Sequence, residues 1–422
     1  KKDEDYRFWK TQPVARFSEQ VESEGPIDSS KTPDDIPAEP YALLKEFEWD
    51  TLDLEDKSII MEVYELLYGN YVEDTDSTLR FSYSPEFLDW ALKAPGWRKD
   101  WHVGVRVAGT KKLVAFISGI PVTLDVRGKV IDSAEINFLC IHKKLRSKRL
   151  APVMIKEVTR RINKQNIWQA LYTAGVVLPK PVSTCRYYHR SINWPKLNDV
   201  GFSPLPYGMT RAKMVAKYAL PSETSTAGLR RMVAADVPAV HELLTKYLRK
   251  FELSQVFSQD EIRHWMIHDE EIADEKRVVY SYVVDSPDNT LTDFVSFYKL
   301  PSTVLGNSSH NSINIAYSFY YASTTSLELP RDDKAGVLNL QSRLQVLFND
   351  ALILAKQANF DVFNALTLLD NSLFLEDLKF GAGDGFLNYY LFNYKAFPIN
   401  GGYLENGKLD GINRSGVAVV ML

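Results

Sequence analysis

The sequence predicts a mixed α/β protein in which one arrangement of helices and strands occurs twice in tandem. The chain has 422 residues, 45% hydrophobic and 25% charged, a globular composition with room for two or three domains. Similar passages follow one another in the same order in both halves, and each half alternates helical with strand-like segments. We therefore expect two related α/β units that share one continuous, twisted sheet with a pseudo-twofold axis.

Two helical segments open each expected unit. An acidic start followed by apolar residues at helical spacing predicts helices over 53–67 and 233–244. The next pair, 83–92 and 257–266, shares an aromatic residue, a serine able to cap a helix, acidic residues in the first turn and a tryptophan. The same order in both halves indicates a duplication.

Strands and one long helix complete each unit. Segments rich in β-branched and aromatic residues predict a hairpin and a third strand, followed by a helix and a last strand. The paired ranges are 101–107 with 277–284, 112–124 with 291–303, 134–141 with 311–322, the helices 151–165 with 336–357, and 167–177 with 361–369. This order resembles the acetyltransferase-like (GNAT) α/β fold, in which an acyl-CoA lies where a central strand feeds a helix.

The expected domain organisation is an arm and two halves. Residues 10–40 are rich in Pro, Glu, Asp and Ser and show little periodicity, which is typical of an irregular surface segment. We expect the arm to comprise 1–46, the first half 47–205 and the second half 206–422.

Composition excludes several classes of function. With 50 basic and 54 acidic residues the chain has no global field for nucleic acid. The seven histidines have no metal-ligand spacing, so no metal is expected. Two cysteines are too few for a disulfide framework, and neither a signal peptide nor a long apolar run is present. We expect a cytoplasmic monomer without a transmembrane segment.

A basic turn follows the apolar strand that ends near residue 141. The seven residues from 143 to 149 contain Lys143, Lys144, Arg146, Lys148 and Arg149, and Pro152 favours a helix start near Ala151. Cations at a positive helix end repel it, so this turn is suited to a multiply charged anion such as a pyrophosphate. "RSKRLA" resembles the phosphate loop of acetyltransferases, with Arg149 where Gly is usual. The alternative is a solvated basic turn.

Three further segments are specific enough to indicate a family. "EINFLCIHK" (135–143), "KFGAGDG" (379–385) and the ending "GVAVVML" resemble the signature segments of glycylpeptide N-tetradecanoyltransferases, the N-myristoyltransferases. "PVSTCRYYHRSINWPKL" resembles the fungal branch. The resemblance implies transfer of a myristoyl group from myristoyl-CoA, a co-substrate, to the α-amine of an N-terminal glycine on a protein. It implies no permanently bound cofactor, an acyl-CoA site in the first half and much of the peptide site in the second.

The resemblance also implies residues for the acyl-CoA. Backbone N–H groups of Phe138 and Leu139 would stabilise the oxyanion formed on the thioester, although plain core packing is the alternative reading of these two residues. The CoA phosphates would be held by Arg146, Ser147, Lys148, Arg149, Ala151 and Pro152. Tyr6, Arg7, Phe8 and Trp9 would fold over the ligand.

For the amine, the family assigns the carboxylate of the last residue as the base, here Leu422. The apolar run "VAVVML" predicts that this end is drawn into the core, with an edge strand as the alternative. Asn137 and Thr173 match positions that orient the glycine amine. Cys140 is interpreted as structural, because direct transfer needs no thiol carrier.

Peptide recognition is assigned in the same way. The acidic loop with Val72, Glu73 and Asp74 suits lysines downstream of the glycine, or is simply solvated. Phe81 and Tyr83 would wall the peptide groove. The remaining positions that match family contacts are Tyr187, His189, Gly383 and Asp384. "GAGDG" is not a dinucleotide loop, because the sequence after it alternates like a strand.

Two rival functions stay open at this point. One is a duplicated GNAT acyltransferase that uses another acyl-CoA and a small amine, and needs no acidic peptide groove. The other is an acyl-CoA-binding module without catalysis.

Overall fold

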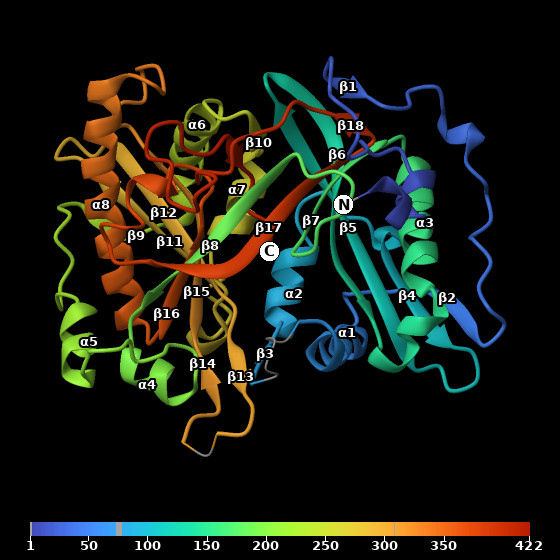
Figure 1. The fold of residues 1–422 in the computed structure, drawn as a ribbon, viewed down its shortest axis with the longest axis horizontal. Coiled ribbons are helices and arrows are strands. Elements are labelled where there is room, and N and C mark those ends of the chain that lie inside the picture. Colours follow the sequence, from blue (N-terminus) through green and yellow to red (C-terminus); the bar gives the residue numbers. More distant parts are fainter. Residues whose placement is uncertain (1, 73–77, 308) are drawn as a thin grey trace.

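The computed structural model describes residues 2–72, 78–307 and 309–422 (Figure 1). In the first half, one strand and two helices come before three further antiparallel strands, and a third helix crosses over to a parallel strand. The bounds are β2 (Phe47–Thr51), α1 (Lys57–Asn70), α2 (Pro85–Leu92), β4 (His102–Val107), β5 (Leu113–Val126), β6 (Lys129–Ile141), α3 (Leu150–Asn163) and β7 (Gln169–Ala174). β6 and β7 pair in parallel, whereas β2, β4, β5 and β6 pair antiparallel.

The second half repeats this arrangement. Its elements are β9 (Leu229–Arg231), α6 (Val237–Leu248), α7 (Gln259–Met266), β11 (Val279–Asp285), β12 (Leu291–Lys299), β15 (Ile315–Ser323), α8 (Lys334–Gln357) and β16 (Val362–Leu366). Here too the pairing is antiparallel up to β15, and β15 pairs with β16 in parallel. The predicted duplication and its GNAT-like element order are confirmed.

The two halves exchange one strand each at the centre of the sheet. β8 (Ser183–Ser191) lies earlier in the chain but pairs with β16 of the second half. β17 (Gly381–Phe392) lies late in the chain but pairs with β7 of the first half. β8 and β17 pair with each other antiparallel, so the predicted continuous sheet forms and contains 14 strands among the described residues. The pseudo-twofold axis that relates the two halves passes between β8 and β17.

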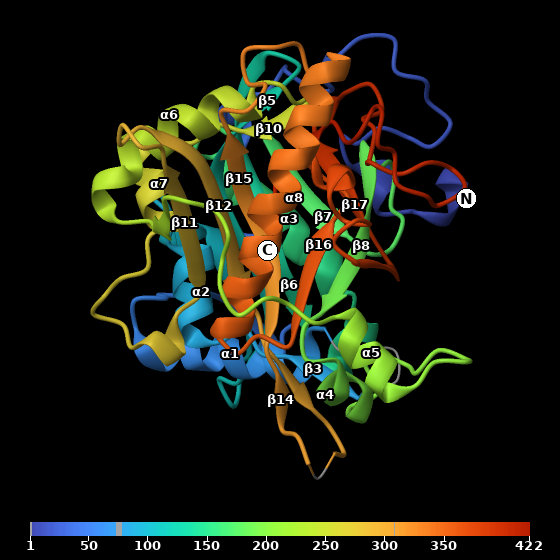
Figure 2. The same cartoon turned by 90° about the vertical axis from the view of Figure 1, so that its left-hand side faces the viewer.

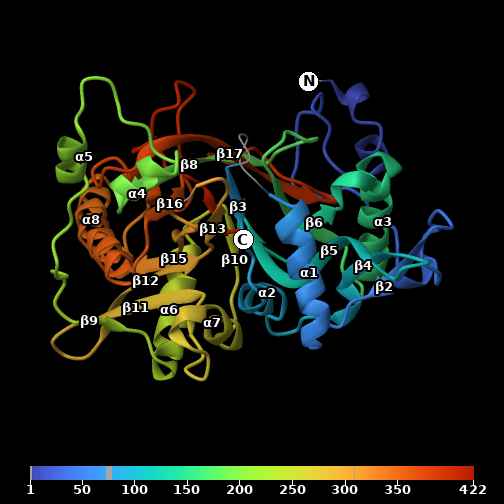
Figure 3. The same cartoon turned by 90° about the horizontal axis from the view of Figure 1, so that it is seen from below.

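Helices cover both faces of each half. Figure 3 shows α3 on one side of the first sheet half, with α1 and α2 on the other, and α8 on the side opposite α6 and α7. Figure 2 shows α8 crossing in front of β15 and β16. The apolar stripe of α3 packs through Met154, Val158 and Ile162 on Val105 and Ile117, in a core cluster separate from the main one. The crossover from β6 through α3 to β7 in the first half therefore has its own small core.

Local sequence signals explain where the helices begin. The side chains of Ser84 and Ser258 accept hydrogen bonds from the backbone N–H groups of Phe87 and Glu261, as the capping pattern predicted. α3 begins at Leu150, so Pro152 is its third residue and not its first. It still lies in the first turn, where no intrahelical donor is required.

The remaining elements join the halves, add β10 and β19 to the large sheet, and form two small separate sheets, β1 with β18 and β3 with β13 and β14. They are β1 (Gly25–Pro26), β3 (Leu79–Phe81), α4 (Trp194–Asp199), α5 (Arg211–Lys217), β10 (Leu253–Gln255), β13 (Ser302–Val304), β14 (Ser312–Ile313), β18 (Tyr394–Lys395) and β19 (Val417–Ala418). β10 pairs with both β5 and β19, which fixes the end of the chain against the first half.

The N-terminal segment is the irregular arm that its composition predicts. Among the described residues before Phe47 it forms three short 3-10 turns and β1, which pairs with β18. Two backbone carbonyls of the arm, at Pro37 and Ala38, accept hydrogen bonds from Arg160 of α3. Arg160 and Arg161 in turn bind the carboxylate of Glu157, which is fully buried. In the part of the chain described, none of the helices has the length and apolar character needed to cross a membrane.

Candidate active site

A split between two parallel strands creates the site. β6 and β7 pair only at Ser133 with Gln169, Ala134 with Ala170, and Glu135 with Leu171. Beyond these pairs the strands separate, and Asn137 and Thr173 line the gap. Parallel strands that part before their ends expose backbone groups that neither strand satisfies, which is a natural place for a ligand.

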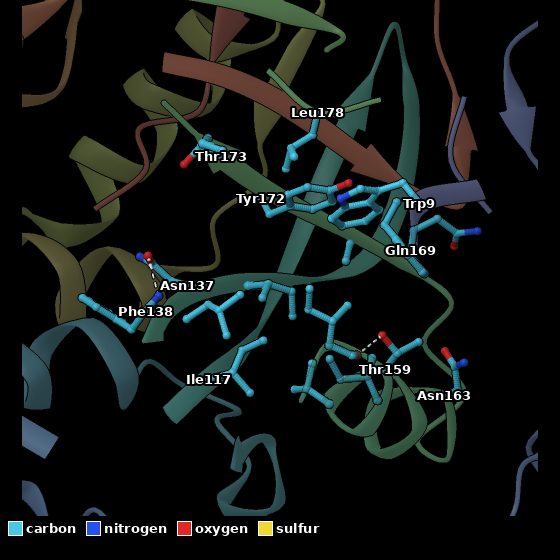
Figure 4. A pocket seen from close by; sticks show the side chains of 18 of the residues that line it. Trp9, Ile117, Asn137, Phe138, Thr159, Asn163, Gln169, Tyr172, Thr173 and Leu178 are labelled. Carbon is cyan, nitrogen blue, oxygen red and sulfur yellow. Dashed lines mark hydrogen bonds between the residues drawn. The ribbon is translucent and has the colours of Figure 1, made fainter. Parts of the chain in front are cut away.

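The gap widens into an apolar cavity of about 350 Å³ between the sheet and α3 (Figure 4). Its apolar lining includes Ile117, Ile136, Leu139, Ile155, Val158 and Ile162. Polar groups are few, and Thr159 uses its hydroxyl to donate to the carbonyl of Ile155 (2.7 Å). An apolar tunnel with few polar groups suits an extended hydrocarbon chain.

Phe138 marks a β-bulge at the inner end of the cavity. In the β5–β6 ladder Phe116 pairs with Cys140 and Ser118 with Asn137, so Phe138 and Leu139 fall outside the register. Phe138 has φ +58°, a left-handed conformation that costs a bulky residue about 1–3 kcal/mol. Its N–H donates to Oδ1 of Asn137 (2.9 Å). The strand distortion expected at this motif is present, and it turns backbone N–H groups away from the ladder.

The basic turn lies at the start of α3, as its sequence predicts. Residues 143–148 form a 3-10 turn, and Arg149 takes φ +54°, which explains why glycine is usual there. Lys144, Arg146, Ser147, Lys148 and Arg149 are exposed, and Ala151 and Pro152 form the first turn behind them. Arg146 donates to the carbonyl of Asn70 (2.7 Å), and Lys148 lies 3.5 Å from Glu46. These contacts therefore hold Arg146 and Lys148 close to the N-terminus of α3.

The arm closes one side of the cavity. The indole of Trp9 lines it and stacks on Tyr172 (centroids 5.7 Å apart, planes 11° apart), and Phe8 packs against Trp9. The hydroxyl of Tyr6 donates to the carbonyl of Val177 (3.1 Å), whereas Arg7 is exposed. Within the described residues, the buried hydroxyl of Tyr172 has no hydrogen-bond partner. A polar ligand atom in this cavity would satisfy it, so the lining fits the acyl-CoA that the motifs imply.

The end of the chain enters the core and lies beside the bulge. Val417 to Met421 are buried, and Leu422 is partly exposed. The backbone carbonyl of Val419 accepts a hydrogen bond from Tyr389 (2.8 Å), and that of Leu422 accepts one from Nδ2 of Asn137 (3.0 Å). The predicted burial is confirmed, and the alternative of an edge strand is also correct for Val417–Ala418, because β19 lies at the edge of the large sheet beside β10.

Four of the residues predicted for the peptide lie on the paired strands β8 and β17, namely Tyr187, His189, Gly383 and Asp384. Nδ1 of His189 is 2.6 Å from Oδ1 of Asn364, and the imidazole packs edge-on against Phe202. Burial lowers the pKa of His189, while Asn364 and the nearby Asp384 oppose this shift. Gly383 faces the same imidazole, because a Cβ there would lie 2.5 Å from its Nε2.

A cluster of tyrosines connects β8 with the bulge. Tyr83 packs on Phe138 (5.4 Å between centroids), and burial raises its pKa well above the usual value, with smaller contributions from neighbouring tyrosines. These neighbours are Tyr71, Tyr187, Tyr298 and Tyr317. Phe81 lies in β3, and its ring centroid is 6.5 Å from that of Tyr83. The predicted peptide walls, Phe81 and Tyr83, thus pack in the same hydrophobic cluster as Tyr187.

Two other sequence predictions have different outcomes. Val72 is exposed, but Glu73 and Asp74 of the acidic loop lie outside the described residues. Burial raises the pKa of Cys140 to about 12, which disfavours the nucleophilic thiolate. Cys140 lies in the main core, where it was expected.

Sequence reasoning missed most of the cavity lining. The missed residues include Thr159, Asn163, Trp168, Gln169 and Tyr172. A signal existed for α3, because residues 155, 159 and 163 follow one another at intervals of four and share one helical face. No comparable signal identified Tyr317 or Asn364, which lie near Tyr83 and His189 because β8 pairs with β16 of the second half.

The duplicated GNAT-like fold and its apolar cavity define an α/β protein of the acyl-thioester-binding class. Residues 26–185 match the model of the N-terminal domain of myristoyl-CoA:protein N-myristoyltransferase, and residues 199–420 match that of its C-terminal domain. The chain belongs to this family.

Individual relatives agree over nearly the full length. Glycylpeptide N-tetradecanoyltransferase of Candida glabrata is 57% identical, covering 100% of this chain and 94% of the relative. The Saccharomyces cerevisiae enzyme of the same name is 56% identical, covering 99% and 92%. A crystal structure of Saccharomyces cerevisiae N-myristoyltransferase with bound myristoyl-CoA superposes with a TM-score of 0.98 at 55% identity, covering 100% of this chain and 96% of that one.

Proposed function

We propose that this protein transfers the myristoyl group of myristoyl-CoA to the α-amine of an N-terminal glycine on protein substrates. The observation that carries the proposal is the apolar cavity that ends at the Phe138 bulge, beside Asn137 and Leu422. A thioester whose alkyl chain fills this cavity has its carbonyl near distorted backbone donors. The relative that superposes on this chain is described with bound myristoyl-CoA, which supports the same co-substrate here.

In this proposal the first half binds the acyl-CoA. Arg146, Ser147, Lys148 and Arg149, with the first-turn residues Ala151 and Pro152, hold the CoA phosphates through charge and helix-end donors. Trp9, with Tyr6, Arg7 and Phe8, covers the ligand. The stacking of Trp9 on Tyr172 supports this role, because it fixes the arm over the cavity.

The chemical step uses main-chain groups. The N–H groups of Phe138 and Leu139 stabilise the oxyanion, each worth ~2.7–4 kcal/mol in the transition state. Because Phe138 now donates to Asn137, it must share or release that bond when the oxyanion forms. Asn137 and Thr173 orient the amine, and the carboxylate of Leu422 removes its proton. This role requires a free carboxyl group on Leu422, which mass spectrometry of the C-terminal peptide of the native protein checks.

The peptide site forms from both halves. His189, Gly383 and Asp384 contact the segment after the glycine, and Phe81, Tyr83 and Tyr187 enclose its start. Val72, Glu73 and Asp74 receive downstream lysines. The arm, 47–205 and 206–422 remain the proposed functional divisions, with acyl-CoA mainly on the first half and peptide mainly on the second.

We further propose that the enzyme is a cytoplasmic monomer. Both cysteines are free and buried, which fits a reducing compartment. Light scattering during gel filtration tests the monomer, and cell fractionation tests the compartment.

One assay tests the activity directly. The protein is incubated with myristoyl-CoA and a peptide that begins with Gly and has Ser at its fifth position, and with the matched peptide that begins with Ala. Mass spectrometry should find a single myristoyl group on the α-amine of the Gly peptide and none on the Ala peptide. Transfer to a lysine-only peptide at an equal rate would favour another acyltransferase, and acyl-CoA binding without turnover would favour a binding module.

Deletion of Met421 and Leu422 tests the proposed base. It should slow acyl transfer far more than it weakens myristoyl-CoA binding. An unimpaired deletion variant would remove Leu422 from the mechanism.

A further inference from the structure

The carboxyl group of Glu135 lies on the sheet face against which the chain end packs. Glu135 precedes Asn137 by two residues in β6, so both side chains point to the same face, with Cα atoms roughly 7 Å apart. Register places Leu171 of β7 beside Glu135, and Tyr389 of β17 beside Thr173 on that face. Tyr389 and Asn137 bind the carbonyls of Val419 and Leu422. The last residues therefore run across this face, next to Glu135.

The buried carboxylates among the described residues are each bound by a cation or, as in Asp350 and Asp410, by backbone N–H groups, whereas Glu135 has neither. Glu157, Asp370 and Asp293 each bind arginine. Among the described residues no hydrogen bond or ion pair reaches the carboxyl of Glu135, and its side chain is partly exposed. Burial raises its pKa to about 7, because water is displaced and nothing replaces it.

Apart from Leu422, the groups that face Glu135 are apolar side chains and tyrosines that stay neutral near pH 7. From β5 and β7 it meets Ile120 and Leu171. From β15 it meets Tyr320, whose hydroxyl donates to Gln255 of β10 (3.2 Å) and accepts from the N–H of Val420 (2.9 Å). Burial raises the pKa of Tyr320, and Glu135 adds to this shift, so the phenol stays neutral. Burial also raises the pKa of Tyr389, so this phenol stays neutral as well.

We propose that Glu135 is a positioning residue for the acyl transfer, which acts through Leu422 by taking up the proton that the glycine ammonium loses before it attacks the thioester. This inference rests on the proposed function and adds to it the destination of the proton. Glu135 provides a second carboxyl group on the sheet face where the chain end packs.

The proton balance is complete without another reactant. The ammonium gives one proton to the Leu422 carboxylate, which passes it to Glu135 and is ionised again. The neutral amine attacks the thioester carbon, the carbon–sulfur bond breaks, and the second amine proton goes to the CoA thiolate. The partly exposed Glu135 then releases its proton to solvent, so the net products are amide, CoA thiol and one proton.

Three variants of the full-length protein test the proposal. Glu135→Gln removes the titrating group while keeping its size, and Glu135→Asp keeps a carboxyl. Asp132→Asn makes the same chemical change as Glu135→Gln at an exposed position of the same strand and serves as the matched control. For each protein we measure the single-turnover transfer rate from bound myristoyl-CoA to saturating Gly peptide across pH 5.5–9, with the dissociation constant of myristoyl-CoA.

The wild-type rate should rise through an inflexion near pH 7. Glu135→Gln should lower the plateau rate on the order of tenfold to a hundredfold and abolish this inflexion, while the myristoyl-CoA dissociation constant stays within about twofold. Glu135→Asp and Asp132→Asn should keep the inflexion. Because all four proteins use one peptide, titration of the peptide amine cancels in the comparison. A Glu135→Gln variant with the wild-type rate and pH profile overturns the proposal, as does one that loses rate but keeps the inflexion.

A second measurement is independent of turnover. Infrared difference spectra of the myristoyl-CoA complex should show a protonated-carboxyl band that disappears near pH 7 in the wild type and is missing in Glu135→Gln. If the wild type transfers no myristoyl group, the proposed function fails by itself. If the band does not titrate near pH 7, Glu135 cannot hold the proton, and this inference fails while the transferase activity stands.

Discussion

The side chain of Asn137 joins the β-bulge at Phe138 to the end of the chain. Its Nδ2 donates to the carbonyl of Leu422 (3.0 Å), and its Oδ1 accepts from the N–H of Phe138 (2.9 Å). One amide thus holds both the proposed base and a proposed oxyanion donor. This arrangement requires an amide, because a carboxylate could accept from Phe138 but could not donate to Leu422.

We therefore predict that Asn137→Asp impairs acyl transfer more strongly than Asn137→Ala. Both variants lose the bond to Leu422, and the aspartate also places a negative charge beside the developing oxyanion. Single-turnover rates should fall by roughly a hundredfold or more for the aspartate and less for the alanine. Myristoyl-CoA affinity, measured by calorimetry, should change little. Equal losses in the two variants would contradict the electrostatic argument.

Neutralising the basic turn should weaken binding of the CoA moiety. In Arg146→Gln/Lys148→Gln two charge-assisted contacts to phosphate are lost, and affinity for myristoyl-CoA should fall roughly tenfold or more. The affinity of this variant for myristoyl-CoA should depend less steeply on salt concentration than that of the wild type. Lys213→Gln, at an exposed position of α5, is the control. An unchanged dissociation constant would leave the turn as a solvated surface.

The arm should slow the release of acyl-CoA. Trp9→Ala removes the stacking on Tyr172 and part of the cavity wall, so we expect the dissociation rate of myristoyl-CoA to rise about three- to tenfold. Trp9→Phe should release myristoyl-CoA at a rate close to that of the wild type. Stopped-flow displacement measures these dissociation rates. Identical rates for Trp9→Ala and the wild type would argue against the proposal that Trp9 covers the acyl-CoA.

We expect a glycine to be needed at position 383 for peptide binding, because His189 occupies the space that a side chain there would fill. A Cβ at Gly383 would lie 2.5 Å from Nε2 and 2.9 Å from Cδ2 of His189. Gly383→Ala should therefore displace the imidazole, cost about 1–3 kcal/mol and raise the KM for peptide without changing acyl-CoA affinity. In a His189→Ala background the same substitution should cost less. Additive effects in this double-mutant cycle would show that the two positions are not coupled.

The buried Glu157 should stabilise the attachment of the arm. Burial by itself raises its pKa, but the bonds from Arg160 and Arg161 overcome this effect and hold the pKa below the usual value. Glu157→Gln should lower the free energy of unfolding by about 2–3 kcal/mol at neutral pH. Because the folded pKa is lowered, this stabilisation is complete above the ordinary glutamate pKa. It should shrink as the pH falls towards the lowered value.

Chemical denaturation at several pH values measures that difference. The exposed pair of Glu242 and Lys246 offers a control, since Glu242→Gln breaks a surface ion pair and should cost less than about 1 kcal/mol. A pH-independent difference between wild type and Glu157→Gln would show that the ion pairs do not cause the effect.

The sequence predicts the elements well because most of them carry local signals. The serine caps of α2 and α7, the apolar stripe of α3 and the alternation of β17 all involve neighbours along the chain. The basic turn and the strand distortion at Phe138 could be predicted too, the latter through the motif around it. Glu73 and Asp74 stay predictions, and so do the roles assigned to the other site residues.

The sequence by itself determined that an apolar strand leads into a basic helix start, that the unit occurs twice, and that the last residues are apolar. Only the tertiary structure decided that β8 and β17 change places, which brings His189 to Asn364 and Gly383 from distant parts of the chain. It also placed Leu422 on Asn137, 285 positions away, and left Glu135 beside them without a counter-ion. The physical reason is that hydrogen bonding along a strand and helical periodicity are local, whereas strand order in a sheet depends on how the whole chain buries its apolar faces.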